Sequence, residues 1–136
     1  MTRSAKTPFH SPRSFQLWHY GIGHKELVLR SQAGGQEPET LDIVFETVRA
    51  MKLHTHYPTL TIRSATPEER KRIREFSDGG PGELSGVGHY YLVLESERDP
   101  AFVVCRRVEA YARPGAEADY RITASTGRLV WAGSRA

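Results

Sequence analysis

The histidines are the residues of this 136-residue chain whose spacing comes closest to a site of chemistry. His54 and His56 are separated by one residue, and in an extended strand two such side chains point to the same side. Two imidazoles on one side of a strand are able to bind one metal ion, and His89, His19 or His24 would supply the third ligand. One reading of the chain is therefore a metal-dependent protein.

The order of these histidines is similar to that of the cupin-type β-barrels. The cupin pattern has a glutamate shortly after the histidine pair, whereas this chain continues with Tyr57. Lys52, two residues before the pair, would repel a cation, and no neighbouring carboxylate is placed to orient the rings. We therefore expect the pair to be partly exposed and free of metal. A cupin-like barrel that binds a metal or small ligand through His54, His56 and His89 is kept as the alternative.

Other catalytic signatures are weak. The single cysteine, Cys105, lies in an apolar run beside Arg106, and we interpret it as a small core residue rather than a reactive thiolate. The chain has no Gly-x-Ser-x-Gly, His-Glu-x-x-His or Gly-x-Gly-x-x-Gly motif. No catalytic residue and no cofactor are predicted, and whether the protein is an enzyme stays open.

The elements that would position any site are mostly strands. Alternation over Phe15–Tyr20, two glycines, and a branched aliphatic run over Glu26–Arg30 predict a hairpin. A further strand begins at Leu41, and its alternation slips near Thr47. The slip predicts either a bulge or a strand bent between two sheets. A short strand at Leu60–Arg63 follows.

One helix is predicted at about 67–76. Thr66 and Glu69 form a capping box around Pro67, which suits the first helical position. Ile73 and Phe76 give the helix a narrow apolar stripe. Its basic residues are predicted to form a solvated face, with an anion-binding face as the alternative: Arg70, Lys71, Arg72 and Arg74.

Two more hairpins are predicted after the helix. The first joins His89–Ser96 to a long strand at Ala101–Tyr111, and the second joins Tyr120–Ala124 to Arg128–Ala132. The fold class is therefore mainly β, with α+β at the margin. About eight antiparallel strands would form a barrel or a two-layer sheet as a single domain over residues 14–136.

Aromatic side chains fall on both faces of these strands. Trp18 and Tyr20 are predicted to share one face, opposite Leu17, because strand side chains alternate. Tyr90 and Tyr91 are predicted to point opposite ways. Both faces of at least one sheet are therefore expected to be covered.

Charge and composition narrow the range of partners. The net charge is +3, with 19 basic and 16 acidic residues, and residues 1–13 contain Arg3, Lys6 and Arg13 without an acid. The rest of the chain is then formally neutral, which argues against nucleic-acid binding. We interpret residues 1–13 as a disordered basic tail. One cysteine and no long apolar run predict a cytoplasmic protein that does not bind membranes.

Part of the sequence resembles a family of small uncharacterised bacterial proteins. The pattern is Leu17-Trp18-x-Tyr20, His24, Leu27-Val28-Leu29-Arg30-Ser31 and Asp42-Ile43-x-Phe45, in the first half of the chain. The resemblance implies a bacterial cytoplasmic protein of unknown function. It also implies that Trp18, His24, Arg30 and Asp42 belong together. Arg30 and Asp42 have apolar neighbours on adjacent segments, so they are predicted either to pair across strands or to be exposed charges at strand ends.

The function predicted from these observations is a small non-enzymatic binding or protein-interaction module. A protein partner or self-association as a homodimer is expected. The candidate ligand or interface residues are Trp18, Tyr20, His24, Arg30 and Asp42.

Overall fold

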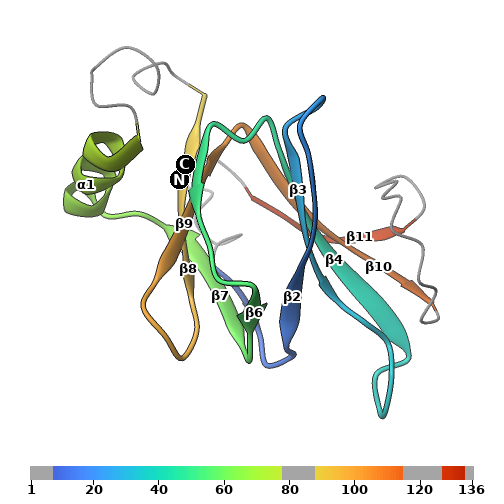
Figure 1. Ribbon diagram of the computed structural model, residues 1–136. Coiled ribbons are helices and arrows are strands. Elements are labelled where there is room, and N and C mark those ends of the chain that lie inside the picture. Colours follow the sequence, from blue (N-terminus) through green and yellow to red (C-terminus); the bar gives the residue numbers. More distant parts are fainter. Residues whose placement is uncertain (1–7, 78–87, 115–126, 134–136) are drawn as a thin grey trace, which may run out of the picture.

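Two antiparallel sheets pack face to face in the computed structural model, which describes residues 8–77, 88–114 and 127–133 (Figure 1). Sheet A has the strand order β1 (Phe9–Ser11), β7 (Leu60–Ser64), β8 (Tyr90–Glu95), β9 (Ala101–Cys105), β5 (Ala50–Lys52). Sheet B has the order β11 (Arg128–Ala132), β10 (Arg107–Pro114), β4 (Glu39–Glu46), β3 (Glu26–Ser31), β2 (Phe15–Gly21), β6 (His56–Tyr57). The two sheets do not close into a barrel. The predicted mainly β class is confirmed, in its two-layer form.

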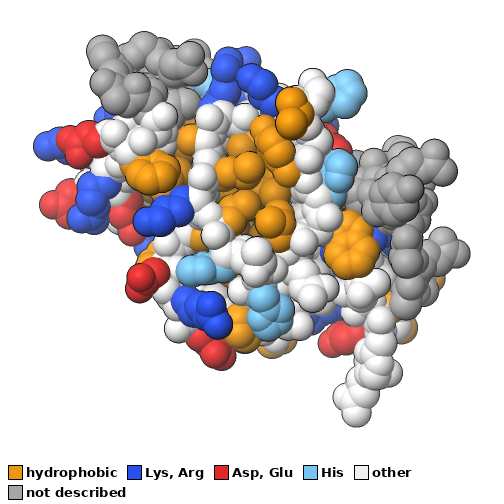
Figure 2. Space-filling model, viewed as in Figure 1, with side chains coloured by type: hydrophobic (Ala, Val, Ile, Leu, Met, Phe, Trp, Pro, Cys, Tyr) orange, Lys and Arg blue, Asp and Glu red, His pale blue; other side chains and the backbone are white. Residues whose placement is uncertain are grey.

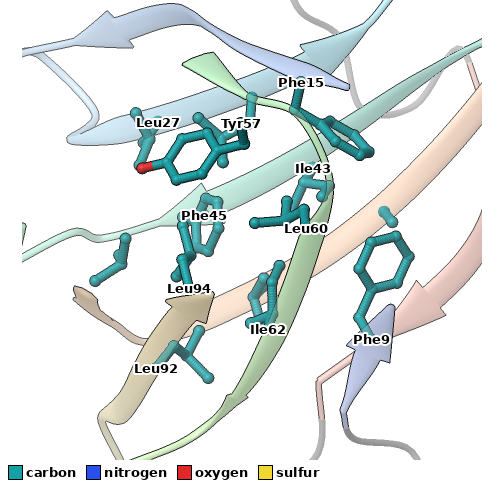
Figure 3. Packing of buried hydrophobic residues seen from close by; sticks show 14 of the residues in the cluster. Phe9, Phe15, Leu27, Ile43, Phe45, Tyr57, Leu60, Ile62, Leu92 and Leu94 are labelled. Carbon is teal, nitrogen blue, oxygen red and sulfur yellow. The ribbon is translucent and has the colours of Figure 1, made fainter. Parts of the chain in front are cut away.

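The core fills the space between the two sheets (Figure 3). Sheet B contributes cross-strand pairs such as Leu27 with Phe45 and Leu29 with Ile43, since residues opposite each other share a face. Sheet A contributes the alternate residues of β7 and β8. The largest fully buried apolar side chains are Phe15, Leu27, Leu29, Ile43, Phe45, Tyr57, Leu60, Ile62, Leu92 and Leu94.

Two of the points where the chain crosses between the sheets lie next to each other. β4 ends at Glu46, Thr47 takes a positive φ of 56°, and β5 then pairs with β9 in the other sheet. The predicted slip near Thr47 is therefore a change of sheet. The prediction of one continuous strand over Ala101–Tyr111 is wrong, because the chain leaves sheet A after Cys105. There the Arg106 amide donates to the Glu46 carbonyl at 3.0 Å, so the two crossings support each other.

A bulge in β2 changes which side chains share a face. Leu17 is opposite Leu29, the next pair is His19 with Val28, and Tyr20 is then opposite Leu27. Tyr20 therefore lies on the core side together with Leu17, and Trp18 lies on the outer side. The prediction that Trp18 and Tyr20 share a face is wrong, because one extra residue reverses the alternation of every residue after it.

The N-terminal segment belongs to the fold from Phe9 onward. β1 pairs with β7, and Phe9 is buried in the core, with its ring 5.1 Å from that of Trp131. Arg13 donates to the Ser31 and Glu39 carbonyls at 3.1 and 2.7 Å. The predicted tail boundary at residue 13 is thus wrong, because the buried Phe9 ring and the pairing of β1 with β7 hold this segment in the fold. Residues 1–7 lie outside the described part.

The helix α1 (Pro67–Ser77) begins as predicted and covers the outer face of sheet A (Figure 1). The Thr66 amide donates to the Glu69 carboxylate at 2.9 Å, and the Glu69 amide donates to the Thr66 hydroxyl at 3.2 Å. Ile73 is buried against Tyr91 and Val104, while Tyr90 packs on the main core. Tyr90 and Tyr91 thus point opposite ways, as predicted.

The C-terminal strand of the last predicted hairpin is present. β11 pairs with β10 at the end of sheet B, and its predicted partner, Tyr120–Ala124, lies outside the described residues. Within the described ranges, none of the helices is long and apolar enough to span a bilayer.

Candidate functional site

Three of the predicted site residues come together on the outer face of sheet B. Arg30 on β3 donates from Nε to Asp42 Oδ1 at 2.6 Å and from Nη2 to Asp42 Oδ2 at 3.1 Å. The guanidinium carbon lies 4.7 Å from the centre of the Trp18 ring. Arg113 on β10 donates to Asp42 Oδ2 at 3.3 Å. The predicted cross-strand pair of Arg30 and Asp42 is confirmed.

This cluster is almost closed to solvent. The side chain of Arg30 is 0% exposed and that of Asp42 is 6% exposed. Trp18 Nε1 is buried and has no hydrogen-bond partner within the described part of the chain. Buried charges that satisfy each other leave little surface for a ligand, and removing one of them is costly to the fold. We therefore interpret Arg30 and Asp42 as structural residues.

The other two candidates lie elsewhere. His24 is exposed in the turn between β2 and β3, at the other end of this hairpin from Arg30. Tyr20 is on the opposite face of sheet B and is 36% exposed. The grouping that the resemblance implied thus holds for Trp18, Arg30 and Asp42 but not for His24.

The three histidines of the metal alternative face different surroundings. His54 Nε2 lies 2.8 Å from the Asp99 carbonyl oxygen, and the ring packs edge-on against Tyr57. His56 is exposed on β6, whereas both ring nitrogens of His89 are buried and have no hydrogen-bond partner among the described residues. The expected partial exposure of His54 and His56 is confirmed. In the described part of the chain, no three His, Cys, Asp or Glu side chains are grouped closely enough to hold a metal ion.

Cys105 does not offer a nucleophile. Its thiol is buried in the core, and this desolvation raises its pKa to about 12 because the thiolate would lose its hydration. A thiol of that pKa is protonated at neutral pH and reacts slowly.

An apolar opening on one side of the sandwich is the first surface that sequence reasoning missed. It lies between the part of β2 that follows Gln16, beyond the pairing with β6, and the edge strand β5, and it exposes side chains of the core side of each sheet (Figure 2). We call it the side window and define it by Leu17, Tyr20, Met51 and Leu53. Leu17 and Tyr20 are each 36% exposed, and Met51 and Leu53 pack half-buried on the core.

Backbone hydrogen bonds frame the side window above and below. The Val48 amide donates to the Lys25 carbonyl at 2.9 Å where the chain crosses to sheet A. The Leu17 amide donates to the Thr55 carbonyl, also at 2.9 Å, where the chain crosses back. Residues 48–55 thus bridge the sheets at both ends, and the apolar surface between them stays open. The opening exists because β6 pairs with only the first two residues of β2, Phe15 and Gln16.

The rim of the side window is basic. Lys25 and Arg49 are exposed where the hydrogen bond from the Val48 amide to the Lys25 carbonyl joins the two sheets. Figure 2 shows basic and histidine side chains around the apolar patch, with the acidic side chains mainly near α1 and the lower margin. Glu26 and Glu46 alternate onto the outer face of sheet B, away from the opening.

A pocket under α1 is the second surface that was missed. It has a volume of about 290 Å³, close to the lower end of the range for small-molecule sites. Its floor and walls come from α1, β8, β9 and the end of β5. The lining residues are Lys52, Glu69, Arg72, Ile73, Phe76, Val93, Pro100, Ala101 and Phe102.

The acidic residue of this pocket is neutralised by an ion pair, whereas, among the described residues, its two basic residues are not. Glu69 accepts from both Arg63 Nη1 and Nη2 at 2.8 and 2.9 Å, and this pair lowers the pKa of Glu69 to about 2. The negative charge of Glu69 is thus compensated by Arg63. In the described part of the chain, Lys52 and Arg72 form no ion pair, and both are exposed.

The basic run of α1 is divided between two environments. Arg70 and Arg74 lie over the Tyr91 ring, with guanidinium carbons 4.8 and 5.9 Å from its centre. Arg72 instead lines the pocket. The spacing of Glu69, Arg72 and Phe76 predicts a shared helix face, but only the docking of the helix on β9 turns that face into a pocket wall.

No family model, curated protein or solved structure matches this chain. The fold defines a two-layer antiparallel β protein with one helix on an outer face.

Proposed function

We propose that the protein is a non-enzymatic interaction module that binds an extended segment of a partner protein along the side window. The observation that carries the proposal is the exposure of Leu17 and Tyr20, which stand on the core side of β2. Apolar side chains of a core face are normally covered, and an exposed cluster of them marks an interaction surface.

Strand geometry supports an extended partner. Among the described strands, β5 has β9 as its neighbour in sheet A, and its other edge faces the side window. Beyond Gln16, β2 has no described strand on the same side. Free strand edges bind extended peptides through the backbone, and alternate side chains of the peptide then enter the apolar surface. A segment of alternating pattern fits both requirements.

Charge supports an acidic partner. Lys25 and Arg49 would attract carboxylates placed between the apolar side chains of the segment. A second copy of this chain would bring the same basic rim and be repelled, so a different protein is favoured over a homodimer. The setting proposed for this module is the bacterial cytoplasm.

The test is a binding measurement with a fluorescent ten-residue peptide that alternates glutamate with leucine and phenylalanine. We expect saturable binding by fluorescence anisotropy and at least a tenfold weaker signal for the same peptide with lysine in place of glutamate. Leu17→Ser and Tyr20→Ser should weaken binding. Leu129→Ser is the matched control, because Leu129 is a 53% exposed apolar residue on β11, away from the side window.

Three outcomes would contradict the proposal. The peptide fails to bind, the Leu129 variant loses as much affinity as the Leu17 variant, or the protein forms a dimer that Leu17→Ser dissociates. The last result, measured by analytical ultracentrifugation, would assign the side window to self-association.

A further inference from the structure

We infer that the pocket under α1 is a binding site for a small organic carboxylate with an apolar body, such as a medium-chain aliphatic acid. This site is separate from the side window, because it lies on the outer face of sheet A. The shape of the pocket, its apolar surface and its uncompensated positive charge fit such a ligand.

The apolar body of the ligand would lie on an already formed surface. Ile73, Val93 and Ala101 form buried parts of the lining, and Phe102 is half-buried. Phe76 stands against Phe102 at a ring distance of 5.4 Å and an angle of 84°.

Phe76 is 62% exposed, the second-largest exposure among the described large apolar side chains. An aliphatic chain bound in the neighbouring pocket would cover this ring and remove its apolar surface from water. The sequence places Phe76 on the helix face toward the sheet, so its exposure results from the space left beneath the helix.

The carboxylate would lie at the rim between Lys52 and Arg72. Lys52 Nζ is 5.7 Å from the centre of the Phe76 ring, so a positive charge stands directly beside the apolar wall. Glu69, the acidic residue of the lining, is held by Arg63 and is compensated there. The local charge therefore favours an anion, and the neighbouring apolar floor distinguishes an aliphatic acid from an inorganic anion.

A titration of the full chain with octanoate, followed by NMR of the backbone amides, tests the inference. We expect saturable shifts in α1, β8, β9 and the end of β5, the elements that line the pocket. Octan-1-ol, which lacks the charge, and acetate, which lacks the chain, should each bind about tenfold more weakly. The affinity should fall with added salt, because the pocket is open to solvent.

Variants separate this site from general attraction to a basic helix. Arg72→Gln should weaken octanoate about three- to tenfold, the range expected for one partly exposed charge-assisted contact. Lys71→Gln is the matched control, since it makes the same charge change on the next residue and lies outside the lining. Phe76→Ala should also weaken binding. Lys71, Arg72 and Phe76 are all exposed, so an unchanged melting temperature is expected for each of the three variants.

Charge reversal gives the sharpest outcome. In the double variant Lys52→Glu with Arg72→Glu, octanoate binding should be lost and octylammonium should bind instead. The inference is overturned if octanoate does not saturate, if its shifts fall outside α1, β8, β9 and the end of β5, or if Lys71→Gln and Arg72→Gln lose affinity equally. These outcomes do not depend on peptide binding at the side window, which the Leu17 variant tests separately.

Discussion

Replacing Asp42 by asparagine should destabilise the protein strongly, although the two side chains have almost the same shape. Asp42 provides the negative charge between Arg30 and Arg113, with contacts of 2.6, 3.1 and 3.3 Å. Asparagine removes that charge and puts an amide donor in place of one acceptor oxygen. The two guanidinium groups then face each other without this counter-charge.

The expected loss of unfolding free energy in Asp42→Asn follows from the burial of the three charged side chains. The side chains of Arg30, Asp42 and Arg113 are 0%, 6% and 18% exposed, so water cannot replace the lost carboxylate. Removing one partner of a buried ion pair costs about 3–5 kcal/mol of unfolding free energy, and part of that loss is recovered where another group can relax toward solvent. Arg113 is the partly exposed member, and we therefore expect about 3 kcal/mol.

Urea denaturation at pH 7 followed by circular dichroism measures this change. Glu39→Gln is the control on the same strand, because Glu39 pairs with Arg128 at 2.8 Å between side chains that are 36% and 64% exposed. That exposed pair should contribute less than about 1 kcal/mol. The double variant Arg30→Met with Asp42→Leu should recover much of the stability lost in Asp42→Asn. A loss in Asp42→Asn no larger than in Glu39→Gln would refute the assignment of a buried, charge-dependent cluster.

Three further predictions concern the edge strand β1, the cap of α1 and the pH dependence of stability. Phe9→Ala should cost about 3 kcal/mol of unfolding free energy, because Phe9 is buried on Trp131, and an unchanged denaturation midpoint would show that β1 adds nothing to the fold. Thr66→Ala should cost about 1 kcal/mol through loss of the cap, with Thr59→Ala, a residue outside the capping box, as the control. Because the pKa of Glu69 is lowered from 4.5 to about 2, the stabilisation from its contacts should be present above pH 4.5 and lost as the pH falls toward 2. A Glu69→Gln variant whose acid denaturation matches that of the original protein would contradict this.

Local sequence patterns were sufficient to predict the elements that depend on interactions between residues close together in the chain. The capping box at Thr66 and Glu69 specifies the start of α1, because its hydrogen bonds join residues three apart. The first hairpin follows from alternation and glycines in the same way. The pairing of Arg30 with Asp42 could be predicted, since two polar residues in apolar strands on adjacent segments require each other.

Tertiary structure decided what depends on register and on contacts between distant segments. One extra residue at Trp18 moves Tyr20 to the core side, and alternation in a single strand cannot reveal a bulge whose cause is pairing with β3. Phe9 joins the core only because β7 accepts β1 as its neighbour, 50 residues later in the chain. The side window and the pocket under α1 are spaces between elements. Such a space depends on where β6 stops pairing with β2 and on how far α1 stands from β9, and neither quantity is encoded in the periodicity of one segment.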